Sequence, residues 1–80
     1  MWKDKLKLGE GETLRLDRDY TKGSMAQEDV YEYSVLNTQG DVVGRIVRRD
    51  ETTHSLQRRQ SLEQRDSQGN VLVAEYWTGD

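Results

Sequence analysis

The chain contains no cysteine and a single histidine, His54. Without cysteine it forms no disulfide, and it lacks the thiolate ligands of the common structural zinc sites. One histidine also cannot provide a two-histidine metal site. The sequence therefore predicts no metal and no cofactor, and the missing thiols leave the redox compartment open.

Large apolar residues are scarce as well. The chain has no phenylalanine, and apolar residues make up 32% of its 80 residues, against 34% charged residues. A chain of this length is expected to form one domain, residues 1–80, with a thin core. The net charge of -3 gives little of the self-repulsion that keeps disordered chains open. Small folds without disulfides often gain stability from a partner subunit, so the composition favours association.

No apolar run approaches the length needed to span a membrane. Charged residues recur at every second or third position near the N-terminus, so the chain lacks the apolar region of a signal peptide. We therefore expect a cytoplasmic protein without a membrane partner.

Two similar turns are the clearest local signals. Residues 37–40 and 66–69 each carry Asn or Asp at the first position and Gly at the fourth, the pattern of a type I turn that ends in a G1 bulge. Apolar residues alternate with polar ones in residues 30–36, and residues 71–77 are rich in β-branched and aromatic side chains. Both turns therefore predict antiparallel hairpins.

The N-terminal part suggests a third hairpin. Leu6 and Leu8 precede residues 9–12, and Leu14 and Leu16 follow them, so apolar residues alternate on both arms. Residues 20–27, after this hairpin, are expected to form a loop, with room for at most one short helical turn near residues 24–29.

Residues 54–65 are ambiguous because glutamine, arginine, leucine and glutamate all favour helices. Leu56 and Leu62, six positions apart, would share one face of a strand, which favours a strand and leaves a helix open. The predicted fold is thus all-β, a small antiparallel meander of about five or six strands. It would form either an open curved sheet or a small barrel.

Positive charge gathers in one part of the sequence. Residues 45–65 contain six arginines and three acidic residues, a net charge of +3. A hairpin of residues 42–49 and 54–64 that turns near Glu51 and Thr52 would place Val47 opposite Leu56. It would also bring like charges together by placing Arg45 opposite Arg58. Such a surface could bind single-stranded nucleic acid, but the sequence pI of 5.1 and the fifteen carboxylates favour ion pairs within the chain. The candidate anion or nucleic-acid surface comprises Arg45, Arg48, Arg49, Arg58 and Arg59.

Tyrosine and tryptophan supply all the aromatic residues, and these types favour half-wet positions such as protein interfaces. Neither a nucleophile motif nor a specific carboxylate pair occurs, so no catalytic residue is assigned. The sequence predicts a non-enzymatic module that binds itself or another protein, with sheet-edge pairing as a natural mode. The alternative is a single-stranded nucleic-acid-binding domain. The candidate interface comprises Tyr31, Tyr33, Tyr76 and Trp77.

Overall fold

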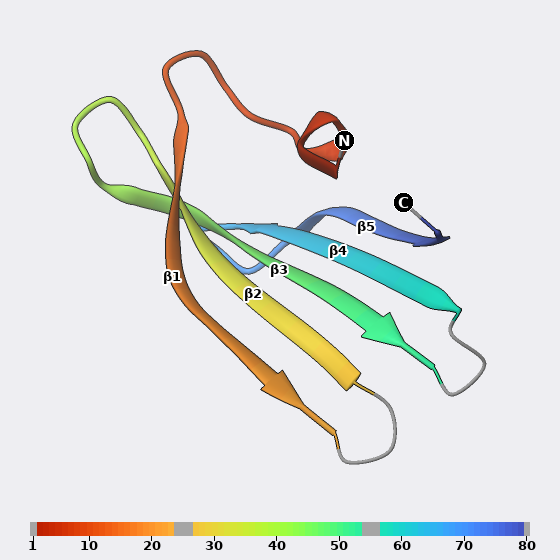
Figure 1. The fold of residues 1–80 in the computed structure, drawn as a ribbon. Coiled ribbons are helices and arrows are strands. Elements are labelled where there is room, and N and C mark those ends of the chain that lie inside the picture. Colours follow the sequence, from red (N-terminus) through yellow and green to blue (C-terminus); the bar gives the residue numbers. More distant parts are fainter. Residues whose placement is uncertain (1, 24–26, 54–56, 80) are drawn as a thin grey trace.

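The protein forms one five-stranded antiparallel sheet in which each strand pairs with its neighbour in sequence (Figure 1). The computed structural model describes residues 2–23, 27–53 and 57–79. A 3-10 helix, η1 (Trp2–Lys5), precedes the sheet. The strands are β1 (Thr13–Lys22), β2 (Gln27–Leu36), β3 (Val42–Thr52), β4 (Arg58–Asp66) and β5 (Val71–Thr78). The predicted all-β meander is confirmed, as an open sheet with β1 and β5 at its edges.

The two predicted hairpin turns are both present. Asn37 and Asp66 each accept a backbone hydrogen bond from a glycine three positions later, Gly40 and Gly69. The side-chain oxygen of the same Asn or Asp accepts two further backbone N–H groups of its turn. Both glycines have a φ near +85°, which glycine adopts without the steric cost that a side chain adds. Five consecutive residues, from the Asn or Asp to the residue after the glycine, therefore decide each turn.

The two faces of the sheet differ in what covers them. On one face, which we call the covered face, Val35, Ile46, Leu62 and Val73 from four successive strands form the buried core. Trp2 and Leu6 of the N-terminal segment pack against this core. The other face, the open face, carries Arg49, Ser61 and Tyr76 in one cross-strand row.

A buried glutamine holds the N-terminal segment on the covered face. The Lys7 N–H donates to Oε1 of Gln64, and Nε2 of Gln64 donates to the Lys7 carbonyl, both at 2.8 Å. Gln64 is only 2% exposed. Its side-chain amide therefore bonds both the backbone N–H and the backbone C=O of Lys7, and this fixes the N-terminal segment over β4.

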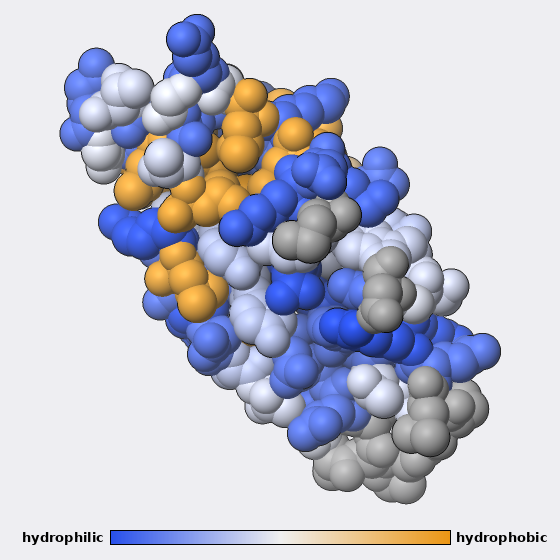
Figure 2. Space-filling model, turned by 45° about the horizontal axis from the view of Figure 1, so that its top comes forward, coloured by the Kyte–Doolittle hydropathy of each residue, from blue (hydrophilic) through white to orange (hydrophobic). Residues whose placement is uncertain are grey.

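On the face that Figure 2 shows, apolar residues gather toward the end of the molecule that contains the two glycine turns. Figure 2 shows orange atoms gathered in the upper half, while the lower part of that view is mostly hydrophilic. The rows at the other end of the sheet pair charged residues, for example Glu28 with Glu51 and Asp29 with Asp50. The four-residue core on the covered face therefore lies toward the glycine turns, whereas Val30, also buried, lies near the charged end on the open face.

Three sequence expectations need correction. The third hairpin is wrong: Leu6 and Leu8 lie outside any strand, and β1 pairs with β2 instead. Leu6 packs against the core of the sheet without pairing as a strand, whereas Leu8 is 42% exposed. The expectation for residues 20–29, a loop with room for one helical turn, is also wrong: β1 continues to Lys22 and β2 begins at Gln27, while residues 24–26 lie outside the described residues.

The expected register of the β3–β4 hairpin is the third error. Arg45 lies opposite Arg65, and Val47 lies opposite Glu63. β3 continues to Thr52, so the turn comes later than the sequence suggested. The ambiguous segment is a strand from Arg58, whereas residues 54–56 lie outside the described part of the chain.

Candidate functional site

The free edge of β5 is the candidate site. The Gly79 N–H donates to the Arg58 carbonyl at 2.8 Å, so these opposed residues form a hydrogen-bonded pair. Such pairs alternate along an antiparallel ladder. Val73, Glu75 and Trp77 therefore direct their backbone groups toward β4. The residues between and beyond them direct N–H and C=O groups away from the sheet: Ala74, Tyr76 and Thr78.

The side chains of β5 are unusually apolar for an edge strand. Tyr76 is 81% exposed and Val71 is 50% exposed, while Leu72 is also exposed. Glu75 is the only charged residue between Val71 and Thr78. Natural sheets usually protect an edge with charges, proline or a bulge. β5 has a bulge only at its start, where Arg65 lies opposite Val71 and Gln64 lies opposite Val73.

The opposite edge strand, β1, has the protection that β5 lacks. Its pairing with β2 shifts between Leu16 and Arg18, so Asp17 occupies a bulge. The buried Ser34 hydroxyl donates to Asp17, and Arg15 Nε lies 2.8 Å from Asp17 Oδ1. The hydrogen bond from Ser34, and then that from Arg15, lower the pKa of Asp17 below its usual value. Charged residues also flank the bulge, so β1 is a poor template for another strand.

The four predicted interface aromatics do not form one surface. Tyr31 and Tyr33 lie on the covered face beneath the N-terminal segment, and the ring of Tyr33 is 5.3 Å from that of Trp2. The Arg48 guanidinium lies over both Trp2 and Tyr31, at 5.1 and 4.3 Å from the ring centroids. These rings therefore hold the N-terminal segment in place. Among the four, only Tyr76 is largely exposed.

Trp77 is partly buried at the rim of a groove of about 930 Å³ between η1 and the ends of β4 and β5. Lys5 Nζ lies 5.0 Å from the centroid of its ring. This contact places the positive charge of Lys5 on the covered face, directly beside β5.

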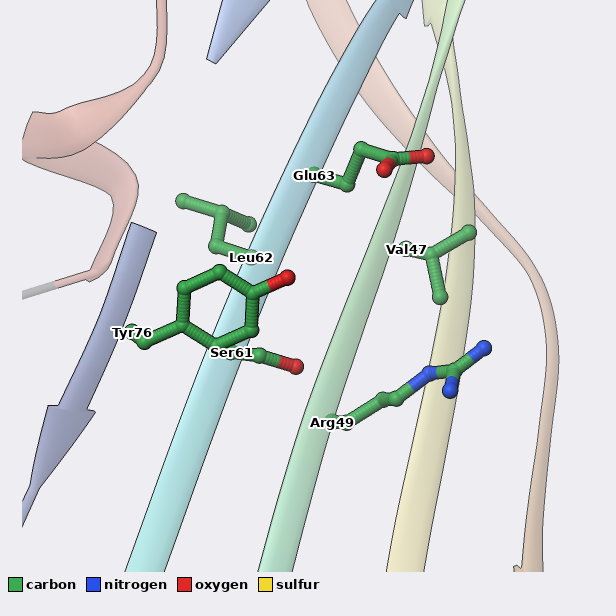
Figure 3. Close-up of a pocket in the computed structure, with 6 residues that line it drawn as sticks. All are labelled: Val47, Arg49, Ser61, Leu62, Glu63 and Tyr76. Carbon is green, nitrogen blue, oxygen red and sulfur yellow. The ribbon is translucent and has the colours of Figure 1, made fainter. Parts of the chain in front are cut away.

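Tyr76 borders a shallow depression of about 220 Å³ on the open face. Figure 3 shows Tyr76 and Arg49 on either side of Ser61, whose small side chain leaves the surface low between them. Glu63, at the same depression, is paired with Arg65 at 2.7 Å. The depression thus exposes one side of the Tyr76 ring, and its residues contain no arrangement of nucleophile and base.

The five predicted arginines are divided between the two faces. The strand register places Arg48 and Arg58 on the covered face and the other three, Arg45, Arg49 and Arg59, on the open face. Arg58 forms hydrogen bonds with both carboxylate oxygens of Asp50, and this pairing lowers the pKa of Asp50 below its usual value. The structure therefore does not bring the predicted anion surface together.

Comparisons with protein-family models, with curated proteins and with solved structures gave no match. Within the described ranges, no group of three or more His, Cys, Asp or Glu residues is arranged to hold a metal ion. A helix long and apolar enough to cross a membrane is also absent from the described part of the chain.

Sequence reasoning assigned Tyr76 but missed the backbone groups of Ala74 and Thr78 and the role of Lys5. The sequence did contain a signal for the free backbone groups of Ala74 and Thr78, because the last strand of a meander necessarily lies at an edge. No sequence signal placed Lys5 beside Trp77, since this contact joins segments at opposite ends of the chain.

Proposed function

We propose that the protein is a non-enzymatic interaction module that binds an extended polypeptide segment at the free edge of β5. The observation that carries this proposal is the contrast between the two edges: β5 is apolar and carries a single charge, whereas β1 is bulged and highly charged. Adding a strand to a sheet edge uses backbone hydrogen bonds for affinity and side-chain contacts for specificity.

The free backbone groups of Ala74, Tyr76 and Thr78 supply three N–H donors and three C=O acceptors, which is enough for a short strand. The exposed side chains of Tyr76, Val71 and Leu72 supply apolar surface beside this ladder. A bound strand would remove these backbone groups and apolar side chains from water. Because the core is thin, the added apolar contact would stabilise the fold.

The arginines give less support to the alternative, a single-stranded nucleic-acid-binding domain. Such domains combine a continuous basic groove with stacking aromatics. Here the basic residues lie on both faces, and Arg58 is paired with Asp50. Tyr31 and Tyr33, the predicted stacking platforms, contact Arg48 and Trp2 beneath the N-terminal segment.

A peptide selection tests the proposal. Random nonapeptides displayed on phage are selected on the immobilised protein, and individual binders are then measured against two variants, Ala74→Pro and Ala74→Val. The Ala74 N–H points away from β4, so proline removes a donor from the free edge without removing a bond within the sheet. Valine keeps the N–H and favours strand geometry.

We expect the selected peptides to be rich in β-branched and aromatic residues, to bind Ala74→Val like the parent, and to lose binding to Ala74→Pro. Thermal unfolding followed by circular dichroism checks that both variants fold. Peptides that bind folded Ala74→Pro as tightly as the parent, or a selection that enriches nothing, would contradict edge recognition.

A further inference from the structure

We propose that the natural occupant of this edge is β5 of a second copy of the same chain, paired antiparallel about a two-fold axis at Tyr76. This inference rests on the proposed function, because it names the partner of the same edge. A two-fold axis makes the interface self-complementary, so the assembly closes as a dimer with a continuous ten-stranded sheet.

Backbone geometry limits the possible registers. The free N–H and C=O groups belong to Ala74, Tyr76 and Thr78, so these positions must lie opposite one another in the two copies. Three symmetric registers satisfy this condition with an overlap of at least five residues of β5, whereas an axis at Trp77 would pair only residues 76–78. Their two-fold axes pass through Ala74, through Glu75 or through Tyr76.

Two of these registers are unfavourable. An axis at Glu75 places this carboxylate directly opposite Glu75 of the second copy, and like charges directly opposite are destabilising. An axis at Ala74 requires straight pairing through Val71 and Leu72, where the bulge interrupts the regular strand. The axis at Tyr76 uses only the regular part of β5.

Charge complementarity supports the register with its axis at Tyr76. This register places Glu75 of one copy opposite Trp77 of the second copy, and Lys5 lies over the ring of Trp77. Glu75 is exposed and forms no ion pair with any residue that the structure describes. Each carboxylate therefore meets the ammonium group of the second copy on the covered face, and symmetry forms this pair twice.

The open face is complementary in the same register. Tyr76, the most exposed large apolar side chain among the described residues, lies opposite Tyr76 of the second copy, and aromatic pairs are favourable across strands. Ala74 lies opposite Thr78, and both are small enough to leave room for the two rings. Pairing of β5 with β1 of a second copy would instead be head-to-tail and would meet the charged bulge at Asp17.

A charge exchange tests the predicted ion pairs. The assembly mass is measured by light scattering after size-exclusion chromatography, from about 1 μM to about 1 mM chain, a range that covers affinities from weak to moderate. We expect a dimer that Glu75→Lys and Lys5→Glu each weaken about tenfold, and that the double variant Lys5→Glu with Glu75→Lys restores. Glu10→Lys, in the exposed segment before β1, is the matched control and is expected to dimerise like the parent.

Disulfide trapping tests the register, since the natural chain has no cysteine. Residues in a hydrogen-bonded antiparallel pair have Cα atoms about 5.5 Å apart, within reach of a disulfide. Under a mild oxidant, Tyr76→Cys alone is expected to form covalent dimers quickly. Glu75→Cys and Ala74→Cys, which report the other two registers, are expected to stay monomeric.

A parent protein that remains monomeric throughout the concentration range, together with no trapping at position 76, would overturn the second-copy proposal. In that case, peptides that bind the parent and do not bind the Ala74→Pro variant would still support the proposed edge recognition. Faster trapping at position 74 or 75 than at 76 would overturn the register. Failure of the selection and of the trapping together would overturn both proposals.

Discussion

Replacing Gln64 is expected to release the N-terminal segment from the sheet. The Gln64 amide forms two hydrogen bonds with the backbone of Lys7, both at 2.8 Å. Each such bond contributes about 0.5–1.5 kcal/mol net, so Gln64→Leu, which keeps the side-chain volume, should cost about 1–3 kcal/mol. In a domain of this size, a loss of about 2 kcal/mol lowers the melting temperature by about 8–16 °C.

Two measurements separate release of the segment from general weakening. Thermal unfolding followed by circular dichroism gives the change in stability, and trypsin cleavage after Lys3, Lys5 and Lys7 reports exposure of the segment at a temperature where the sheet is folded. We expect both to change in Gln64→Leu. Gln68→Leu, in an exposed turn where only the backbone is bonded, is the control. A Gln64→Leu protein that melts and is cleaved like the control would refute the role assigned to this amide.

Three further outcomes are expected. Gly44→Ala should lower stability by about 1–3 kcal/mol, because its Cβ would lie 2.8 Å from the Arg65 carbonyl oxygen; a melting temperature equal to that of the parent would contradict this close approach. The melting temperature should be level down to about pH 5 and fall in more acidic solution. Three carboxyls have a pKa below the usual value in the folded protein because each accepts a side-chain hydrogen bond: Asp66 from Asn70, Asp17 from Ser34 and Asp50 from Arg58. The stability that these bonds add is present above the pKa of the unfolded carboxyl and is lost as the pH falls through the pKa of the folded one. Unchanged stability at pH 2 would oppose this account. A fluorescent oligothymidylate should bind no more tightly to the parent than to Arg58→Gln with Arg59→Gln, and a clear loss of affinity with a smaller salt dependence in the double variant would favour the nucleic-acid alternative.

Much of the fold could be predicted because the decisive signals are local. The Asn37 and Asp66 side chains organise their turns within five residues, and glycine follows where φ is positive. The period-two pattern then continues into the flanking strands. The same pattern misled the prediction near Leu6, because two alternating leucines do not require a strand: Leu6 packs on the sheet from an irregular segment, and Leu8 is exposed.

The candidate site was predicted only in part. Tyr76 is exposed, and its place in an interface stays a prediction, whereas Tyr31 and Tyr33 lie beneath the N-terminal segment. The grouping of the arginines depended on the assumed pairing of β3 with β4, and neighbouring residues of a strand point to opposite faces. Arg48 and Arg49 are adjacent in sequence and lie on opposite sides of the sheet.

The sequence by itself determined the strand-rich class, the two glycine turns and the neighbour-to-neighbour order of the sheet, since these depend on preferences expressed over a few residues. Only the tertiary structure decided three features: the register of β3 with β4, the packing of the N-terminal segment on the covered face, and the free edge of β5, which no central bulge or row of charges protects. These features depend on contacts between distant residues, such as the bonds between Lys7 and Gln64, 57 positions apart. No local pattern encodes such a contact, because its free energy exists only when both segments are already in place.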